Sequence, residues 1–296
     1  MFTASQLSPT SLQVHAFFDQ ASFTVTYILE DETSQQCAII DSVLDFDHGA
    51  SQTSTESADN IIRFIQQRKL SLQWLLETHV HADHLSAAPY IQKQLGGKIV
   101  IGEHIDTVQK TFSKLLNLEE KHQAKANVFD LLVNERSQLS LGQHSIKVLH
   151  TPGHTPACVC YVIGGAAFVG DTLFMPDYGT ARCDFPGGNA AQLYQSIQKI
   201  FALGEETRLF MCHDYKAPNR DFYAWETTVA EQKAHNLHIR SGINQEEFCH
   251  MRNQKDATLK MPKLIWPSVQ INMRAGHLPP AESNGQHYLK TPITLA

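Results

Sequence analysis

The chain has no lysine or arginine among its first 62 residues, although nine acidic residues lie there. Secretory signals and transit peptides need positive charge near the amino end, so we expect no targeting segment and a cytoplasmic location. Over the whole chain, 24 Lys and Arg stand against 30 Asp and Glu, and the basic residues form no cluster. Because nucleic-acid binding depends on basic side chains that release counterions from phosphates, we expect no nucleic-acid partner.

The sequence also lacks long apolar runs and regularly spaced cysteines. No apolar run approaches the roughly 20 residues that span a bilayer, so we expect no membrane partner. The six cysteines include no CxxC pair and no regular spacing, which favours reduced thiols over a disulfide framework. With 42% hydrophobic and 18% charged residues, a chain of 296 residues is expected to be globular, with a full core.

Apolar periodicity predicts strands first and an alternation of strands and helices afterwards. The expected strands cover residues 12–18, 23–30, 37–42, 72–78, 98–102, 144–151, 158–164, 166–174 and 208–213. The expected helical segments cover residues 61–70, 86–95, 104–118, 189–203, 221–236 and 245–253. The tail from Lys260 onward contains five prolines and is expected to be irregular but packed down.

Histidine is abundant, with 16 residues, and it is concentrated after one apolar strand. The segment Thr78-His79-Val80-His81-Ala82-Asp83-His84 places four potential metal ligands within six residues. A turn that leaves a strand end can fold such side chains around one point. Imidazole and carboxylate together suit Zn, Fe or Mn better than Ca or Mg.

Three more polar residues follow apolar strands elsewhere in the chain. His154 lies in TPGHT, Asp171 in GDTLF and His213 in CHDY. Four strand ends that carry His or Asp are the arrangement expected when loops at one sheet edge build a metal site.

In order and spacing, these motifs resemble the metal-binding series of the metallo-β-lactamase superfamily. The resemblance implies an α+β fold, a four-layer αββα sandwich with the metal at one edge between two sheets. It begins at AIIDS, where Asp41 resembles the family's acid beside the metal ligands. It also implies a catalytic domain over residues 1–258, with residues 259–296 as a C-terminal extension packed on the same domain.

Within the superfamily, the chain looks most like the persulfide dioxygenases of sulfide detoxification, the ethylmalonic encephalopathy protein group. The similar segments are residues 77–85, 178–188, 213–215, 259–263 and 272–276. One departure is Cys183, which stands where the related segment usually has Thr, with an extra residue between Gly179 and Arg182. This departure puts a thiol near the expected site of persulfide chemistry, and we form the hypothesis that Cys183 is reactive.

The resemblance implies one Fe(II) per chain, held by His79, His154 and Asp171, with no catalytic residue beyond the metal site. The remaining matched residues bind a second metal in two-metal relatives or surround the first, and the sequence leaves that choice open. They are His81, Asp83, His84 and His213, with Asp41 beside them.

The implied substrates are glutathione persulfide and O2, with sulfite and glutathione as products. Glutathione has two carboxylates, which bind to cations and hydroxyl donors. We expect Arg182 to be the cation that binds them. The other expected substrate contacts are Tyr178, Tyr215, Lys216 and Arg274. The alternative is a glyoxalase II-like hydrolase of glutathione thioesters with two Zn ions, disfavoured by the short proline-rich tail. A homodimer is expected by analogy only.

Overall fold

The computed structural model describes residues 2–6 and 11–293. A seven-stranded sheet forms one half of the molecule. Its strands lie in the order β1 (Phe2–Gln6), β2 (Leu12–Asp19), β3 (Thr24–Asp31), β4 (Gln36–Ile40), β7 (Ser71–Leu76), β9 (Lys98–Gly102) and β10 (Leu131–Val133). The first four strands are antiparallel neighbours, whereas β4, β7, β9 and β10 pair in parallel because helices connect them.

A six-stranded sheet forms the other half. Its order is β11 (Gln138–Leu141), β12 (His144–His150), β13 (Val159–Ile163), β14 (Ala166–Phe168), β15 (Arg208–Phe210) and β16 (Glu226–Thr228). A small third sheet contains β6 (Gln52–Ser54), β5 (Val43–Asp47) and β8 (Leu85–Ser86).

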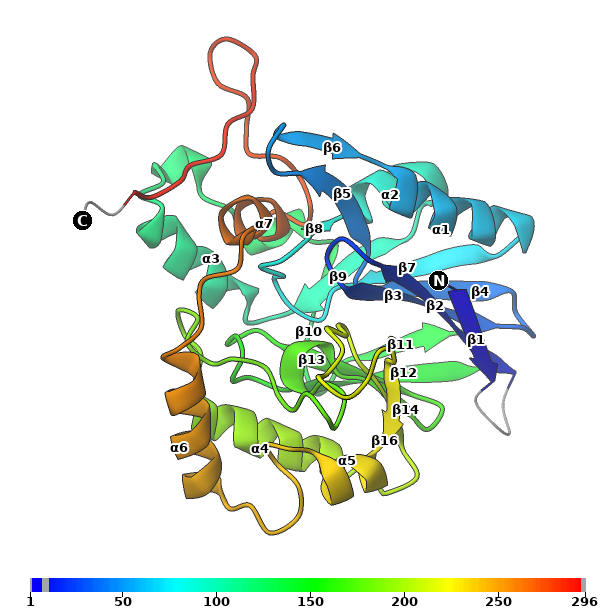
Figure 1. The fold of residues 1–296 in the computed structure, drawn as a ribbon. Helices are drawn as coiled ribbons and strands as arrows, with labels where there is room; N and C mark the ends of the chain where they lie inside the picture. The colour runs from blue at the N-terminus through cyan, green and yellow to red at the C-terminus, as the bar shows by residue number, and fades with distance from the viewer. Residues whose placement is uncertain (1, 7–10, 294–296) are drawn as a thin grey trace.

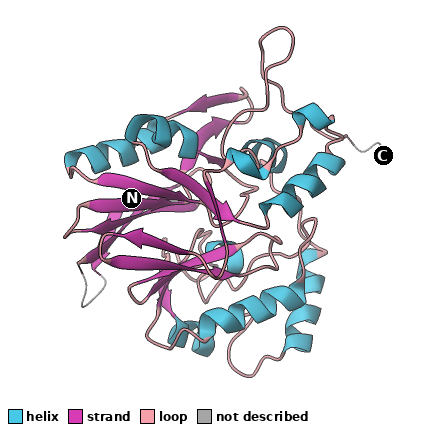
Figure 2. Cartoon of the chain, turned by 180° about the vertical axis from the view of Figure 1, so that it is seen from behind, coloured by secondary structure: helices cyan, strands magenta, loops and turns pink. Residues whose placement is uncertain are grey.

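Helices cover the outer face of each large sheet (Figures 1 and 2). The first sheet is covered by α1 (Glu56–Gln67), α2 (Ala88–Leu95), α3 (Ile105–Leu115) and α7 (Ile265–Asn272). The second is covered by α4 (Ala190–Phe201), α5 (Val229–His235) and α6 (Gln245–Asp256). Short 3₁₀ turns lie at η1 (Glu120–His122), η2 (Ala126–Val128) and η3 (Gly170–Thr172). The predicted αββα sandwich is confirmed, and none of the helices in the described residues has the length and apolar character of a membrane span.

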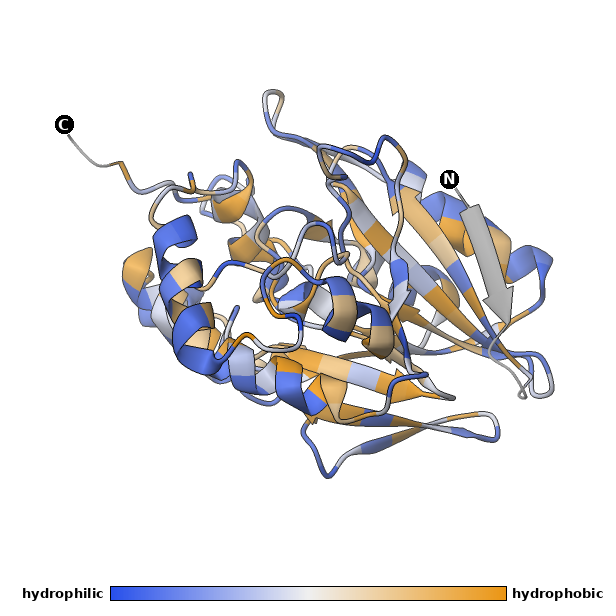
Figure 3. Ribbon diagram, turned by 60° about the horizontal axis from the view of Figure 1, so that its bottom comes forward, coloured by the Kyte–Doolittle hydropathy of each residue, from blue (hydrophilic) through white to orange (hydrophobic). Residues whose placement is uncertain are grey.

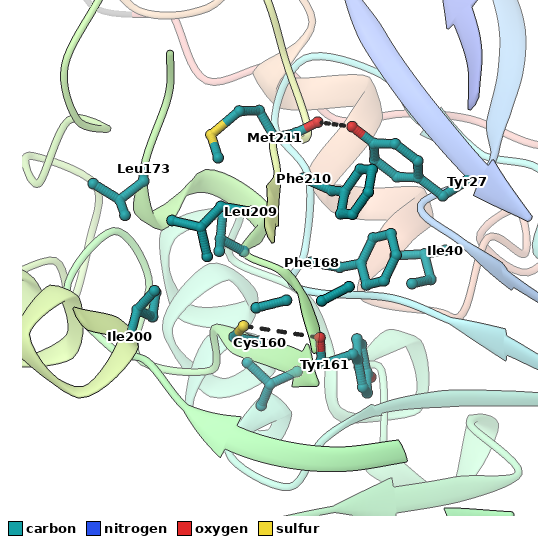
Figure 4. Close-up of a cluster of buried hydrophobic side chains, with 14 of the residues drawn as sticks. Tyr27, Ile40, Cys160, Tyr161, Phe168, Leu173, Ile200, Leu209, Phe210 and Met211 are labelled. Carbon is teal, nitrogen blue, oxygen red and sulfur yellow. Dashed lines mark hydrogen bonds between the residues drawn. The ribbon is translucent and has the colours of Figure 1, made fainter. Parts of the chain in front are cut away.

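Strand alternation divides the core into two clusters. Tyr27 and Leu29 of β3 pack between the sheets, while Ile28, one position along, packs under the helices of the first sheet. Tyr27 also donates a hydrogen bond to the Met211 carbonyl across the sandwich, at 2.6 Å (Figure 4). Hydrophobic and hydrophilic residues alternate along several strands, and several helices show both kinds of residue on their surfaces (Figure 3).

Two sequence predictions are wrong in the last third of the chain. The helix expected over residues 221–236 begins only at Val229, because residues 226–228 pair with β15 as strand β16. Thr228 then caps the helix in a capping box with Glu231. The tail expected to be irregular contains α7, where Pro267 lies in the first turn and needs no intrahelical N–H partner.

Helix α7 packs against β8 of the small third sheet. Between α6 and α7, residues 257–264 form no helix or strand. The division of the chain at residue 258 stays a proposal.

Candidate metal centre

The predicted metal ligands come from four loops at one edge of the sandwich. His79 to His84 follow β7, His154 follows β12, Asp171 lies in η3 after β14, and His213 follows β15. Their ligand atoms fall into two groups, each within 4.8 Å. One group is His79, His154 and Asp171, and the other is His81, Asp83, His84 and His213.

In the first group, two imidazoles face one carboxylate oxygen. Asp171 Oδ2 lies 3.8 Å from His79 Nε2 and 3.7 Å from His154 Nε2. The opposite ring nitrogens are held from behind, because Nδ1 of His79 contacts Thr78 Oγ1 at 3.0 Å and Nδ1 of His154 contacts the Arg182 carbonyl at 2.8 Å. When Nδ1 donates, the Nε2 lone pair is directed at the site, which is how metal-binding histidines are oriented.

Asp171 also faces the second group. Its Oδ1 lies 3.4 Å from His213 Nε2, and the same nitrogen lies 3.2 Å from Asp83 Oδ2. His84 Nδ1 lies 3.3 Å from Asp83 Oδ1, and the Tyr215 hydroxyl donates to Asp83 Oδ2 at 3.2 Å. Asp171 therefore stands between the two groups with one oxygen directed at each.

His81 is held by two buried carboxylates behind it. Its Nε2 lies 3.0 Å from Asp41 Oδ1 and 3.4 Å from Glu77 Oε2. Burial alone would lower the pKa of His81, but the Asp41 and Glu77 carboxylates raise it well above its ordinary value. Burial opposes the charge of Asp41 as well, yet His81 and the hydrogen bonds from Thr78 hold the pKa of Asp41 below its usual range.

Several buried ligand atoms have no hydrogen-bond partner among the described residues. They are His81 Nδ1, His84 Nε2, Asp171 Oδ1 and His213 Nε2. Burial raises the pKa of Asp171, with His213 and His154 acting against that shift. Leaving such groups unpaired is costly, and a cation among them would satisfy them. The residues fit a metal of the Zn, Fe or Mn type, and the donor set alone does not choose among these metals.

A cavity of about 610 Å³ opens on the site. Its walls include the predicted substrate residues Tyr178, Arg182 and Tyr215 beside Asp83, His154 and Asp171. Apolar walls come from Phe174, Phe185 and Leu259. A largely apolar hollow with a few polar groups beside a ligand cluster is typical of a small-molecule site.

The predicted cations lie in different surroundings. Arg182 faces the cavity, but it donates two hydrogen bonds to Asp184, so its charge is already paired. Lys216 lies with its Nζ 4.7 Å from the centre of the Tyr223 ring and does not line this cavity. Arg274 is buried, donates to the carbonyls of Gln270 and His122, and does not line the cavity either.

Sequence reasoning missed two lysines of the cavity wall, Lys255 and Lys263. Lys255 lies in the last turn of α6, beyond the predicted end of that helix at Asn253, so no spacing argument reached it. Lys263 belongs to the segment 259–263 that the sequence singled out without a role. We call these two lysines the basic wall, and they line the same cavity as Asp83, His154 and Asp171.

Cys183 does not have the surroundings of a reactive thiol. Its side chain is buried in the core cluster that includes residues of α4 and α6, and burial raises its pKa far above that of a free thiol. Its backbone N–H donates to Asp256 at 2.8 Å. The geometry favours packing over thiolate chemistry. All six cysteines of the chain are free, as predicted.

Comparison with known proteins places these motifs in one family. A model described as the metallo-beta-lactamase superfamily matches residues 20–213. A Burkholderia pseudomallei protein named "Probable metallo-hydrolase" is 51% identical, over 95% of this chain and 99% of its own length. "Glyoxylase B2" of Dictyostelium discoideum is 45% identical, over 95% of this chain and 97% of its own length.

Two further similarities are to proteins named ETHE1. The mitochondrial protein "Persulfide dioxygenase ETHE1" of Mus musculus is 30% identical, over 88% of this chain and 87% of its own length. The crystal structure of ETHE1 from Myxococcus xanthus superposes with a TM-score of 0.72 at 30% identity, covering 89% of this chain and 99% of that one.

Proposed function

Because the chain belongs to the metallo-β-lactamase superfamily, we propose that it is an Fe(II)-dependent persulfide dioxygenase that oxidises glutathione persulfide with O2 to sulfite and glutathione. The similarity to the mouse persulfide dioxygenase and to the bacterial ETHE1 structure supports this choice. The cytoplasmic location, the absence of a nucleic-acid partner and the homodimer remain predictions.

The observation that carries the proposal is the assembly of the first ligand group. His79, His154 and Asp171 bring two imidazoles and one carboxylate together, the ligand set of non-haem Fe(II) oxygenases. His81 lies outside this group: its Nε2 atom faces Asp41 and Glu77, and the ring belongs to the second group. This arrangement favours a three-residue iron site that keeps coordination positions open for substrate and oxygen.

The reaction balances as one persulfide, one O2 and one water giving one glutathione, one sulfite and two protons. The outer sulfur is oxidised by four electrons and O2 is reduced by four. A bound iron would supply the redox chemistry at its open positions. The chain's own residues orient the ligand histidines through Thr78 and the Arg182 carbonyl, and Phe174 and Phe185 give the cavity apolar walls.

Substrate recognition is assigned to the basic wall of the cavity. In the proposed binding mode, Lys255 and Lys263 of the cavity wall bind the carboxylates of glutathione, and the persulfide sulfur is directed at His154 and Asp171. Tyr178 and Tyr215 add hydroxyl groups on the same walls. In this proposal Arg182 shapes the cavity as an ion pair with Asp184. Lys263 provides a positive charge, and Lys255 adds a second one when its amine is protonated.

The alternative is a glyoxalase II-like hydrolase of glutathione thioesters with two metal ions. The second group, His81, Asp83, His84 and His213, is fully assembled, and Asp171 stands between both groups. The relative named "Glyoxylase B2" also favours this function. Two metals in such a site would activate water for attack on a thioester carbonyl.

The deciding experiment measures metal content and oxygen uptake together. Protein purified without oxygen is expected to contain one iron per chain and to consume one O2 for each glutathione persulfide, with sulfite as product. S-lactoylglutathione should not be hydrolysed. Two zinc ions per chain, thioester hydrolysis and no oxygen uptake would overturn the proposal in favour of the hydrolase.

A pair of histidine variants tests the ligand assignment. His79→Ala removes a ligand of the three-residue group, so we expect it to lose the iron. His81→Ala removes an imidazole that faces Asp41, so we expect it to keep the iron with weaker activity. Metal analysis of both variants checks this, and equal metal loss would point to the two-metal arrangement.

A further inference from the structure

The segment Asn272-Met273-Arg274-Ala275-Gly276 resembles the dioxygenase group, yet the proposed chemistry gives it no part. Asn272 is the last residue of α7, and its side chain is buried against the loop that carries His79 to His84. Its Nδ2 donates to the His84 carbonyl at 2.8 Å and to the His81 carbonyl at 3.0 Å. Its Oδ1 accepts from the Ser86 N–H at 2.8 Å.

This loop needs such a partner because its backbone forms no regular ladder between β7 and β8. Residues 77–84 belong to no helix or strand, and most of them are buried. Buried backbone groups must find partners. The asparagine amide here donates two hydrogen bonds to the loop and accepts one from Ser86 in β8, so both kinds of group at its tip are used.

A chain of side-chain contacts connects Ser86, which Asn272 holds, with the His81 ring. The Ser86 hydroxyl donates to Glu77 Oε1 at 2.6 Å, and Glu77 Oε2 lies 3.4 Å from His81 Nε2. On its other side, α7 is fixed by Gln109, which donates to the Met273 carbonyl at 2.8 Å. Asn272 therefore links the helix to both ends of the segment 81–86.

We propose that Asn272 is a positioning residue of the metal centre, which holds the backbone of His81 and His84 and so sets the direction of their rings. It has no hydrogen bond to His79, His154 or Asp171 among the described residues. Asn272 should therefore affect the position of the second ligand group more than that of the first. The proposal rests on the metal centre of the proposed function, but it holds for either reaction.

Cobalt substitution separates this role from simple folding. Metal-free wild type, Asn272→Ala and Asn272→Asp are titrated with Co²⁺, and affinity is measured against a chelator while the visible d–d bands are recorded. Asn272→Asp keeps the volume and the Ser86 contact but replaces the two donors by a carboxylate oxygen. Gln270→Ala is the matched control, because Gln270 is a buried amide of the same helix that bonds to the Trp266 and Lys290 carbonyls.

We expect both Asn272 variants to bind the more weakly held Co²⁺ at least ten-fold less tightly, or a single Co²⁺ with altered bands. Hydrogen–deuterium exchange should rise in peptides that cover residues 78–87, and Gln270→Ala should change none of these. Wild-type affinity, bands and exchange in a folded Asn272 variant would overturn the proposal. If Asn272→Ala does not fold, the same measurements on Asn272→Asp decide between the two outcomes. A wild type that binds no metal would overturn the metal centre itself.

Discussion

The ammonium group of Lys255 faces an imidazole that already accepts another hydrogen bond. His238 Nδ1 accepts from the Thr180 N–H at 2.9 Å, so a neutral ring carries its proton on Nε2, the atom 3.0 Å from Lys255 Nζ. That contact suits an uncharged amine. Burial lowers the pKa of Lys255, the neighbouring Arg252 lowers it further, and Asp256 opposes the shift. The lysine should therefore lose its charge at a lower pH than a free lysine does.

Lys255→Ala tests this at the level of substrate binding. We expect KM for glutathione persulfide to rise about ten-fold, equal to about 1.4 kcal/mol, with little change in kcat. In the wild type, KM should rise on the alkaline side at a pH below the ordinary lysine value, because the charged form binds carboxylates. The variant should lack this rise. The exposed Lys110→Ala is the control, and an unchanged KM profile in Lys255→Ala would remove Lys255 from substrate recognition.

Single residues were predictable where the chemistry is local in sequence. His79, His81, Asp83 and His84 lie within six residues, so spacing alone indicated a shared site. Asn272 lies 188 residues from the His84 carbonyl that it holds, and no local pattern records that contact. The pairing of Arg182 with Asp184 depends on rotamers, which spacing does not give.

At the scale of elements, the loop that carries His154 is fixed against the start of α4. Gly153 has φ +138, and an added Cβ would lie 2.3 Å from the Leu193 nitrogen. The Asn189 N–H donates to the Gly153 carbonyl at 2.8 Å. Close backbone approach and an unusual dihedral angle both require glycine here.

Gly153→Ala should therefore destabilise the protein by about 3 kcal/mol, since steric overlap adds to backbone strain. Urea unfolding of the metal-free protein measures the change in the free energy of unfolding. Gly165→Ala is matched, because Gly165 also has a positive φ of +79 but nothing within 4 Å of an added Cβ. That variant should lose only about 1 kcal/mol. Equal losses in the two variants would contradict the packing argument.

Elements were predictable where one periodicity dominates. The strand over residues 98–102 has the predicted bounds, and α4 differs from its prediction by one or two residues at each end. In α7, seven of eight residues from Ile265 to Asn272 are buried, so no polar stripe reveals a helix. The predicted helix began too early, at residue 221, because the pairing of β16 with β15 is a long-range contact that a local pattern does not show. The true start could have been found from the local capping box of Thr228 and Glu231.

At the scale of the whole molecule, the sandwich was predictable through family motifs but not through local patterns. The parallel pairing of β4 with β7 and of β14 with β15 joins segments separated by helices, and sheet order is set by these distant contacts. The ligand motifs carried the prediction because they follow strand ends in both sheets. The first sheet supplies His79 to His84, and the second supplies His154, Asp171 and His213.

A metal bound at this edge would join the two sheets, so removing it should weaken the entire fold. Free metal at about a thousand times Kd adds roughly 4 kcal/mol to the free energy of unfolding. Each kcal/mol raises Tm by about 2–4 °C in a protein of this size. We therefore expect dialysis against a chelator to lower Tm by on the order of 10 °C, measured by circular dichroism, and added metal to restore it. In His79→Ala the chelator should change Tm far less, because a ligand from the first sheet is missing. An equal fall in that variant would mean that the chelator acts elsewhere, and an unchanged wild-type Tm would mean that metal binding does not couple the two halves.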